Sequence, residues 1–412
     1  MKIAQISKAD SFGGGASRVA TDLTNLLNEN GQKAVHWMSW SGSGFDTSSK
    51  FPLFGNRGLE VRFLQKGFKK LGLIDVIPFD MMRLLRRKRY KDYDIFHYHD
   101  LSSAISPLSL LYFSQKMPVV WTIHDCSPFT AGCLYPMDCE RFCSKDGCKN
   151  CPQIGQWPID SWFDTSTFLF KIKKYLHSHG NVTLVSPSNW MADMAKKSGI
   201  VEKQPYVIPN GVDTRLFNRK FREEVRSKYN LQKNRPVILL SAGNVRDERK
   251  GINFALKALR ACQDLSPQLL IVGSVDKEFL KELDGFSYVL TGYVGEPEEL
   301  SEIYSAADIF LFCSLADNMP LTILETMSCG VPMIGFRTGG IPEMIDQKET
   351  GILVPQKDVD ALIEALRSCL TEKLYIPYGK ASFLKARRDF SMEKFYERHL
   401  ELYESLLENK KE

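Results

Sequence analysis

A run of three glycines follows the first apolar segment of the chain and could bind a phosphate or a sugar. The segment SFGGGASRVA, Ser11–Ala20, places Gly13, Gly14 and Gly15 between a predicted strand and a predicted helix. Glycine lets backbone amides approach an anion closely, and a helix N-terminus adds partial positive charge. The spacing differs from the GxGxxG pattern of dinucleotide sites, which disfavours a nicotinamide cofactor. The alternative is a tight turn that binds nothing.

A pair of cations follows a second apolar segment. In SAGNVRDERKG, Ser241–Gly251, a buried strand ends and a polar loop carries Arg246, Arg249 and Lys250 before a helix. Ligands of α/β proteins bind at the carboxyl ends of parallel strands, and two adjacent cations there could neutralise a diphosphate. Such a pair is solvent-exposed in many other contexts, but this position favours phosphate binding.

Two carboxylates, Asp317 and Glu325, lie in a third loop and the helix after it. The segment is SLADNMPLTILETMSCGVP, Ser314–Pro332. A carboxylate just beyond a phosphate site suits the two hydroxyls of a ribose, although two acids at this spacing also occur by chance. Free amides that could cradle phosphate are expected across Asn318, Met319, Pro320, Leu321 and Thr322.

Three histidines lie at or just after the ends of predicted strands. His97 and His99 flank Tyr98, so both point to the same face of a strand. A core position and contact with an acceptor are both open for them. His124 also follows a strand end, where α/β sites form, and this favours a functional role.

Six of the ten cysteines lie between positions 126 and 151. Cys133, Cys139, Cys148 and Cys151 form C-x5-C-x8-C-x2-C, and the final CxxC is half of a typical structural zinc site. Reduced free thiols and disulfides are the alternatives. Cys143 could substitute as a ligand, and Cys126 is expected in the core.

The elements that must position these residues alternate between short apolar runs and helical patterns, as in parallel α/β sheets. Predicted strands of the first half are Lys2–Ser7, Lys33–Trp37, Asp94–Tyr98, Val119–Ile123 and Thr183–Ser186. Those of the second half are Tyr206–Ile208, Val237–Ser241, Leu269–Val272, Tyr288–Thr291, Ile309–Phe312 and Val331–Ile334. Predicted helices are Ser17–Asn30, Gly251–Arg260, Pro297–Ala307, Leu321–Cys329, Asp358–Cys369 and Ser391–Leu407. Two doubly wound modules follow, with a boundary near Val201–Pro205.

Size and composition agree with two domains. The chain has 412 residues, and its net charge of +5 is too mild to indicate nucleic-acid binding. The N-terminus lacks the apolar core of a signal peptide, so we expect a cytoplasmic protein with reduced thiols. The basic and apolar stretch MMRLLRRKRYK, Met81–Lys91, could contact an anionic membrane surface or form a solvated helix face.

Several ordered motifs resemble one enzyme family over nearly the whole chain. The spacing from Asp317 to Glu325 is similar to the E-x7-E signature of retaining glycosyltransferases of family 4. The accompanying motifs are VSPSNW, VIPNGVD, the RKG loop, TMSCGVPMIGFRTGGIPEMI and TGILVP. The resemblance implies the GT-B fold, an α/β fold of two doubly wound Rossmann-like domains that face across a cleft. It also implies an acceptor-binding domain over 1–204 with a cysteine-rich insertion over 126–152, a nucleotide-sugar domain over 205–388, and a final helix over 389–412 that crosses back.

The resemblance also implies roles for the motif residues. Glu325 would bind the ribose, Arg249 and Lys250 the diphosphate, and Asp317 with the amides after it would face the donor sugar. Gly14 and Gly15 would close over the phosphates, and Gly243 would lie in the donor loop. His124 would lie by the sugar or the attacking acceptor, so that His124, Asp317 and Glu325 form the expected catalytic set.

Two departures from the family pattern concern the donor. Many relatives carry arginine directly after the glycine of the donor loop, whereas Asn244 follows Gly243 here, and Arg246 is the candidate substitute. Asp317 replaces the first glutamate of the signature and shortens that carboxylate arm.

The expected reaction is transfer of a sugar, with retention, from a UDP- or GDP-sugar to a glycan or lipid-linked acceptor in surface polysaccharide synthesis. We expect no catalytic metal, but we expect structural zinc in the cysteine-rich insertion. The enzyme could also contact the cytoplasmic face of the inner membrane. The alternatives are a nucleotide-sugar epimerase of the same fold and a zinc-stabilised sugar-nucleotide-binding protein without turnover.

Overall fold

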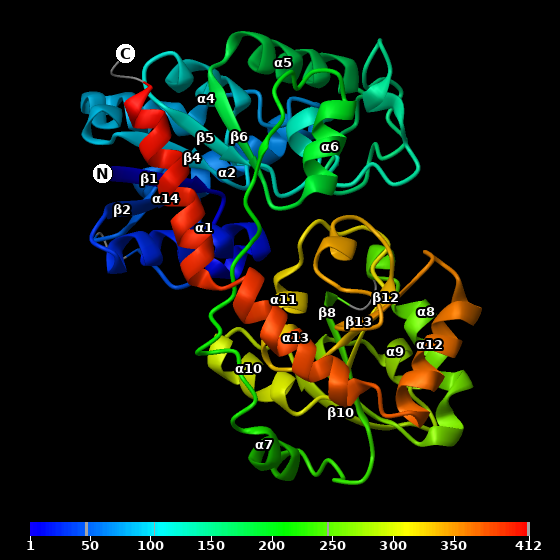
Figure 1. Ribbon diagram of the computed structural model, residues 1–412. Helices are drawn as coiled ribbons and strands as arrows, with labels where there is room; N and C mark the ends of the chain where they lie inside the picture. The colour runs from blue at the N-terminus through cyan, green and yellow to red at the C-terminus, as the bar shows by residue number, and fades with distance from the viewer. Residues whose placement is uncertain (46–47, 103, 245–246, 410–412) are drawn as a thin grey trace. The chain divides into compact units, whose positions relative to one another are not determined.

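The alternating apolar runs and helical patterns fold into two α/β units. The computed structural model describes residues 1–45, 48–102, 104–244 and 247–409. Unit 1 comprises Met1–Pro209 and Tyr396–Glu412, and unit 2 comprises Asn210–Phe395 (Figure 1). The sequence prediction placed the boundary between 204 and 205 and gave 389–412 to the final helix.

The described part of unit 1 contains seven strands, each joined to the next by helices or loops. The strands are β1 (Lys2–Ser7), β2 (Lys33–Met38), β3 (Lys50–Pro52), β4 (Ile95–Tyr98), β5 (Val119–Thr122), β6 (Val182–Ser186) and β7 (Tyr206–Val207). The helices are α1 (Gly15–Glu29), α2 (Gly58–Lys70), α3 (Phe79–Leu85), α4 (Pro107–Ser114), α5 (Ser166–His179), α6 (Asn189–Lys197) and the last helix of the chain, α14 (Met392–Glu408), which begins in unit 2. Short 3₁₀ turns are η1 (Ser11–Gly13), η2 (Gly55–Arg57), η3 (Arg86–Asp92), η4 (Ser127–Phe129) and η5 (Arg141–Cys143).

Unit 2 repeats the same kind of alternation. Its strands are β8 (Val237–Asn244), β9 (Gln268–Ser274), β10 (Ser287–Gly292), β11 (Ile309–Phe312), β12 (Met333–Phe336) and β13 (Gly351–Val354). Its helices are α7 (Arg222–Lys228), α8 (Ile252–Ala261), α9 (Lys277–Glu282), α10 (Pro297–Ser305), α11 (Leu321–Ser328), α12 (Val359–Thr371) and α13 (Tyr375–Asp389). Its 3₁₀ turns are η6 (Glu248–Lys250), η7 (Gln263–Leu265) and η8 (Ile341–Glu343).

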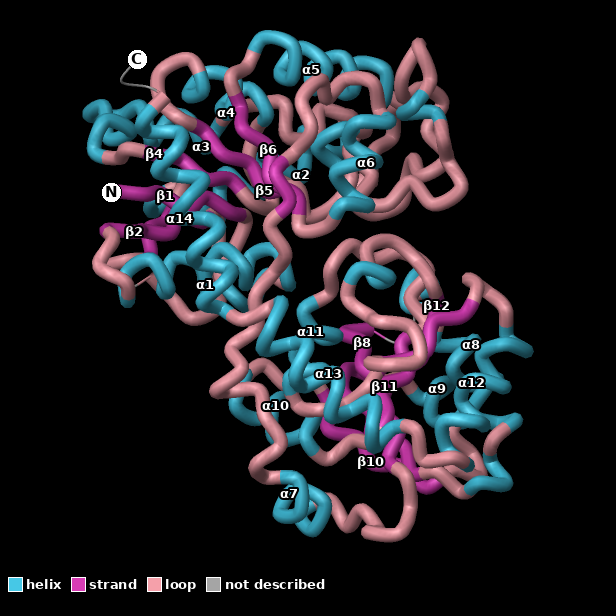
Figure 2. The backbone as a smooth tube through the Cα atoms, viewed as in Figure 1, coloured by secondary structure: helices cyan, strands magenta, loops and turns pink. Residues whose placement is uncertain are grey.

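Each unit is built on one parallel sheet (Figure 2). The strand order is β3-β2-β1-β4-β5-β6-β7 in unit 1 and β10-β9-β8-β11-β12-β13 in unit 2. In both sheets the order reverses beside the first strand, as in doubly wound Rossmann-like folds. The predicted α/β fold class of two doubly wound domains is confirmed.

The central strands of unit 2, such as β8 and β11, carry continuous apolar runs because both faces of the sheet are covered there. Val237 and Leu239 pack into one cluster with Phe310, whereas Ile238 and Leu240 pack into a second cluster on the other face. Parallel strands covered on both sides read as continuous apolar runs, which is how they were found in the sequence.

Four strand assignments need correction. The strand predicted at Tyr206–Ile208 was given to the second half, but β7 pairs with β6 in the sheet of unit 1. The predicted strand Val331–Ile334 begins later, at Met333, directly after Pro332, which has no amide hydrogen for the ladder. Strands β3 and β13 were not predicted as strands.

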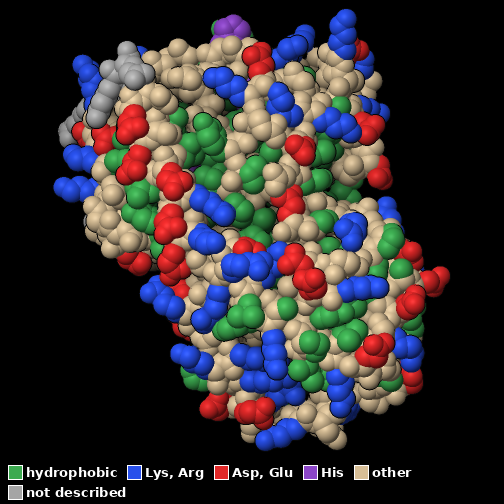
Figure 3. All heavy atoms as spheres, viewed as in Figure 1, with side chains coloured by type: hydrophobic (Ala, Val, Ile, Leu, Met, Phe, Trp, Pro, Cys, Tyr) green, Lys and Arg blue, Asp and Glu red, His purple; other side chains and the backbone are tan. Residues whose placement is uncertain are grey.

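The basic stretch Met81–Lys91 is not one helix, because α3 ends at Leu85 and η3 follows. Arg83 and Arg89 each lie over the ring of Trp37, with guanidinium carbons 5.8 Å from its centroid. Part of the positive charge of the basic stretch is therefore engaged in contacts within unit 1. Figure 3 shows basic, acidic and apolar side chains intermixed over the visible face. Among the described residues, no helix is long and apolar enough to cross a bilayer.

Candidate active site

Arg249, Lys250 and Asp317 form a tight cluster of charges in unit 2. Lys250 Nζ lies 3.0 Å from Asp317 Oδ2, and Arg249 Nη1 lies 3.2 Å from Asp317 Oδ1. Arg249 Nη1 also donates to the carbonyl of Ala316 at 2.8 Å. The predicted phosphate-binding cations and the first predicted carboxylate are thus brought together.

This cluster sits at the carboxyl ends of β8 and β11, which are neighbours in the sheet. The loops after these strands are hydrogen-bonded to each other. The Leu315 amide and the Ser314 hydroxyl both donate to the carbonyl of Arg249, at 2.7 and 3.1 Å. The two loops therefore act as one rigid platform at the edge where α/β proteins bind ligands.

Asp317 stays ionised in spite of its burial. Burial alone would raise its pKa, but Lys250, Arg249 and a hydrogen bond from Ser314 together hold the pKa below its ordinary value. Asp247 also pairs with Arg249, at 3.2 Å, so the cluster holds the two cations against two carboxylates, of which only Asp317 contacts both.

Two glycines allow the loops to approach so closely. Gly251 follows Lys250 with φ of 64°, and a Cβ there would lie 2.0 Å from the carbonyl oxygen of Cys313. Gly339 has φ of 57°, and its Cβ would lie 1.8 Å from the carbonyl oxygen of Asp317. Any other residue at either position would push apart the backbone that holds the charge cluster.

The remaining donor-side predictions surround this platform. Asn318 and Met319 are buried in the loop, and Pro320 is the N-cap of α11, whose first turn contains Leu321 and Thr322. The side-chain amide of Asn210 donates to the carbonyl of Met319 at 2.9 Å and fixes the loop. Glu325 lies further along α11 with only 2% of its surface exposed.

The donor loop of unit 2 is described only in part. Gly243 belongs to the carboxyl end of β8. Arg246, the predicted substitute for the family's arginine, lies outside the described residues.

A buried aspartate that the sequence prediction missed holds the glycine loop of unit 1. Asp10 accepts hydrogen bonds from the hydroxyls of Ser41 and Ser43 at 2.7 and 2.9 Å, and from the amides of Ser43, Gly42 and Phe12 at 3.0, 3.2 and 3.2 Å. Burial opposes its ionisation, but these donors lower its pKa. The feature of the sequence that could have indicated this role is an aspartate shortly before the glycine run.

Two of the predicted glycines, Gly14 and Gly15, have open surroundings. Gly14 and Gly15 are exposed where α1 begins, and a Cβ on either would meet no atom within 4 Å. Their backbone is therefore open to approach by a ligand from solvent.

The three predicted histidines of unit 1 lie next to one another. The rings of His97 and His99 stack with centroids 4.2 Å apart, and those of His99 and His124 lie 5.4 Å apart. His97 and His99 are 0% and 2% exposed, whereas His124 is partly accessible. The idea that His97 and His99 contact an acceptor directly is corrected accordingly, because their rings are enclosed and support His124 instead.

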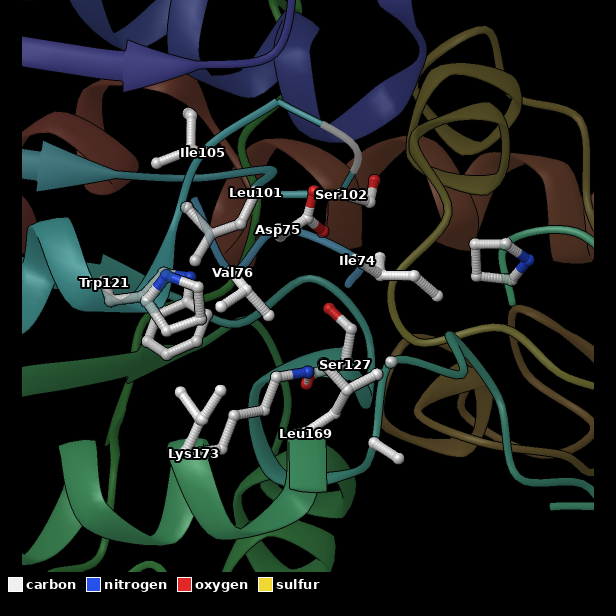
Figure 4. Close-up of a pocket in the computed structure, with 15 residues that line it drawn as sticks. Ile74, Asp75, Val76, Leu101, Ser102, Ile105, Trp121, Ser127, Leu169 and Lys173 are labelled. Carbon is white, nitrogen blue, oxygen red and sulfur yellow. Dashed lines mark hydrogen bonds between the residues drawn. The ribbon is translucent and has the colours of Figure 1, made fainter. Parts of the chain in front are cut away.

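A pocket in unit 1 lies near the ends of β4 and β5, and none of the three histidines is among the residues that line it. It is lined by Ile74, Asp75, Val76, Leu101, Ser102, Ile105, Trp121, Ser127, Leu169 and Lys173, among others. Figure 4 shows Lys173 reaching from α5 toward Ser127, whose carbonyl accepts a hydrogen bond from its ammonium, while Asp75 and Ser102 lie across the pocket. Burial lowers the pKa of Lys173, and the charge of Asp75 acts in the opposite direction. The pocket thus combines an apolar wall with one cation and one carboxylate.

The cysteine-rich insertion forms part of unit 1, and all ten cysteines are free thiols. Cys133, Cys139, Cys148 and Cys151 line one small pocket. Within the described ranges, no three or more His, Cys, Asp or Glu side chains are grouped so as to hold a metal ion. Burial raises the pKa of Cys133 to about 12 and that of Cys148 to about 11. The zinc site stays a prediction.

Two doubly wound units, each built on one parallel sheet, have the architecture of the GT-B fold. A family model described as Glycosyltransferase Family 4 matches residues 13–216, and one described as Glycosyl transferases group 1 matches residues 236–372. The chain belongs to this family of glycosyltransferases, as its motifs predicted.

Curated relatives match the chain over different lengths. N-acetyl-alpha-D-glucosaminyl L-malate synthase of Bacillus anthracis is 22% identical over 97% of this chain and 96% of that protein. The putative colanic acid biosynthesis glycosyl transferase WcaC of Escherichia coli is 24% identical over 76% of each. Sulfoquinovosyl transferase SQD2 of Arabidopsis thaliana is 27% identical over 50% of this chain, which spans only 41% of that relative.

Solved structures show the same fold. Sucrose-phosphate synthase from Thermosynechococcus elongatus superposes with a TM-score of 0.74 at 18% identity, covering 99% of both chains. Anabaena Alr3699/HepE, solved in complex with UDP, gives a TM-score of 0.68 at 14% identity, covering 98% of this chain and 100% of that one.

Proposed function

We propose that this protein transfers a sugar from a nucleoside diphosphate sugar to a glycan or lipid-linked acceptor, with retention of anomeric configuration. The observation that carries the proposal is the platform of Arg249, Lys250 and Asp317, where two cations are held 3.0 and 3.2 Å from one buried carboxylate. The structural neighbour solved with UDP supports a UDP-sugar, and a GDP-sugar is the alternative donor.

Sugar transfer from a nucleoside diphosphate sugar requires positive charge close to the leaving diphosphate, and Arg249 and Lys250 carry such charge. Cleavage of the bond between the anomeric carbon and the phosphate oxygen leaves negative charge on the diphosphate. Cations that are already in place stabilise that charge without reorganising solvent. Arg249 and Lys250 are fixed by Asp317 and by the Ala316 carbonyl before any ligand binds. The acceptor oxygen then bonds to the anomeric carbon on the face that the phosphate leaves, and the acceptor proton passes to the departing phosphate.

A transfer assay with product analysis tests this function. We expect nucleoside diphosphate release from one sugar nucleotide of a UDP and GDP panel to depend on a glycan acceptor, and Lys250→Ala to reduce kcat/KM about tenfold or more. NMR of the product should show the donor's anomeric configuration. An inverted product would refute retention, and conversion of the donor without acceptor would favour an epimerase. Binding without any turnover would favour the binding protein.

We assign the acceptor to the surface of unit 1 around the pocket near the ends of β4 and β5, because the pocket's own volume of about 30 Å³ is too small for a whole sugar ring. Apolar walls suit one face of a sugar ring, and Lys173 with Asp75 could bind its polar groups. A relative whose name includes colanic acid biosynthesis supports an acceptor in surface polysaccharide synthesis. Lys173→Met should raise the KM for acceptor and leave the KM for donor unchanged.

For contact with the membrane we propose α2 in place of the basic stretch Met81–Lys91. Leu59 and Phe63 on α2 are 74% and 78% exposed, one helical turn apart, and Leu64 is 47% exposed. The same helix carries Arg62, Lys66, Lys69 and Lys70. Apolar side chains flanked by cations are typical of helices that lie on anionic bilayers.

A tryptophan-bearing loop extends this surface. Trp162 is 70% exposed, and its amide donates to the carbonyl of Lys70 at 2.9 Å, which places it at the end of α2. Trp157 is 65% exposed and lines a hollow together with Arg62, Lys66 and Lys69. Tryptophan favours the interface between bilayer and water.

Vesicle co-sedimentation tests the membrane proposal. We expect binding to vesicles that contain phosphatidylglycerol, and a loss of about tenfold or more when Leu59→Ser and Phe63→Ser are combined. Leu384→Ser on α13 is the matched control, because Leu384 is 64% exposed in unit 2. Equal binding of both variants, or none by the wild type, would refute the α2 surface.

A further inference from the structure

The hollow beside Trp157 in unit 1 is lined by several basic side chains, and we call it the basic hollow. Its volume is about 270 Å³, close to the lower end of the range of roughly 300–1,000 Å³ that ligand sites span. The basic residues that line it are Lys8, Arg62, Lys66 and Lys69. All of its lining residues belong to unit 1.

One face of α2 supplies most of this charge. Arg62, Lys66 and Lys69 are four and three residues apart, so they lie along one side of the helix. Lys8, directly after β1, lines the same hollow. Two separate elements therefore bring cations to one cavity, which differs from an ordinary solvated helix face.

The cations of the basic hollow have no acidic partner to neutralise them. In the described part of the chain none of them forms an ion pair, whereas the neighbouring Lys70 pairs with Asp160 at 2.5 Å. Burial lowers the pKa of Lys69, and the charges of Asp75 and Asp160 only partly oppose this. The positive charge of Lys8 adds to the lowering. An anion bound in the hollow would supply the opposite charge that Lys69 lacks.

The basic hollow adjoins the surface of α2 that we propose for membrane contact. Leu59 and Phe63 precede Arg62 and Lys66 by three residues each, so the apolar and basic rows are neighbours on the helix surface. Trp157 lines the hollow and is 65% exposed. A ligand whose apolar chain enters the bilayer at Leu59 and Phe63 would therefore place its head group at the cations.

The basic hollow also borders the pocket near the ends of β4 and β5. Ile74, Asp75 and Ile105 line both cavities, and all three are labelled in Figure 4. The surface around that pocket is where we assign the acceptor. A group bound in the basic hollow would therefore lie next to the acceptor sugar.

We propose that the basic hollow binds the diphosphate that joins the acceptor sugar to a lipid, so that the acceptor is a lipid diphosphate sugar. The role of this lipid as a substrate rests on the proposed function, whereas binding of a lipid diphosphate in the hollow does not. Lysine and arginine bind phosphate oxygens through charge-assisted hydrogen bonds. A diphosphate linkage carries more negative charge than the phosphodiester of a membrane phospholipid, and it matches this group of cations better.

Calorimetric titration of the full-length protein with farnesyl diphosphate tests the site, with UDP present to occupy the donor cations. We expect the double variant Arg62→Gln, Lys69→Gln to bind this probe about tenfold or more weakly than the wild type. The matched control is Lys171→Gln, Lys174→Gln, which removes the same charge from exposed positions of α5 that line neither cavity. The control should bind like the wild type. Equal affinities of the two double variants, or no binding by the wild type, would overturn the proposal.

A short-chain phospholipid separates the two possible sources of the phosphate. We expect dihexanoyl phosphatidylglycerol to bind about tenfold or more weakly than farnesyl diphosphate, because its phosphodiester carries less charge. Comparable affinities would show that the hollow binds bilayer head groups and would overturn the diphosphate assignment.

Tryptophan fluorescence locates the bound probe. Farnesyl diphosphate should change the emission of the wild type, and this change should be lost in Trp157→Phe, because Trp157 lines the basic hollow. The same change in Trp157→Phe would place the probe elsewhere and overturn the proposal. None of these measurements involves sugar transfer, so failure of binding at the hollow and failure of the transferase function are observed separately.

Discussion

Neutralising Asp317 should destabilise unit 2 and free the two cations of the donor site. Asp317, Arg249 and Lys250 have side chains that are 11%, 29% and 21% exposed, so their ion pairs are largely screened from solvent. Removing one partner of a buried pair costs about 3–5 kcal/mol, and the partial exposure here places Asp317→Asn near the lower end, at about 3 kcal/mol. For a domain of this size that lowers the thermal midpoint by roughly 6–12 °C.

The matched control for this change is Asp247→Asn. Asp247 also pairs with Arg249, at 3.2 Å, but is 39% exposed and has no contact with Lys250 among the described ion pairs. Exposed pairs contribute less than about 1 kcal/mol, so this variant should unfold within about 4 °C of the wild type. Differential scanning fluorimetry at pH 7.5 measures both.

The pH dependence of the Asp317→Asn effect has a definite sign. The folded-state pKa of Asp317 is lowered, so its stabilisation is fully present above its ordinary value of 3.8 and is lost as pH falls through the folded value. The difference between wild type and Asp317→Asn should thus persist from pH 8 to pH 5 and shrink in more acidic buffer.

A diphosphate should compensate for the lost carboxylate. We expect UDP to raise the midpoint of Asp317→Asn by at least as much as that of the wild type, because the ligand supplies the missing negative charge. If Asp317→Asn were as stable as Asp247→Asn, the charge cluster would not hold the platform together, and the reasoning would fail.

Three further predictions concern a glycine of the donor site, a buried aspartate and the cysteines. Gly251→Ala should abolish detectable UDP binding, because the new Cβ would lie 2.0 Å from the Cys313 carbonyl oxygen. Gly292→Ala is the control: Gly292 also has a positive φ but faces open space, so the change should lower the free energy of unfolding by only about 1 kcal/mol. Equal effects of the two variants in calorimetry would contradict this prediction. Burial raises the pKa of Asp80 to about 7 from an ordinary 3.8, so stability from this group is full below pH 3.8 and is lost as pH rises through 7. Asp80→Asn should therefore be more stable than the wild type at pH 8, by up to about 4 kcal/mol, and denaturant melts that show no gain would refute it. Finally, the unfolded chain should titrate ten thiols without reductant; a shortfall of two would reveal a disulfide, and about one equivalent of zinc in the native protein would support the predicted metal site.

The sequence was most informative where burial is uniform. β1 and β11 have the predicted bounds because their apolar runs are enclosed on both faces. β3 gave no signal, since Lys50–Pro52 is half-buried at the sheet edge and ends in a proline. β7 has only two residues, and its sheet is decided by its pairing with β6 rather than by its own pattern.

The candidate site was predictable one loop at a time but not as a set of contacts. Loops after strands located Arg249, Lys250 and Asp317, yet nothing local indicates that residues 67 apart form an ion pair. Tyr403 falls within the predicted helix Ser391–Leu407, but its contact with Gln5 joins residues separated by 398 positions. Such contacts follow from topology, which a single sequence encodes only indirectly.

Calorimetric titration of nucleotides tests the central claim most directly, because the account assigns the donor diphosphate to Arg249 and Lys250. We predict that UDP or GDP binds the wild type about tenfold or more tightly than the matching monophosphate, and that this preference disappears in the double variant Arg249→Ala, Lys250→Ala. Equal affinity of the wild type for diphosphate and monophosphate, or a preference that survives in the double variant, would contradict the account.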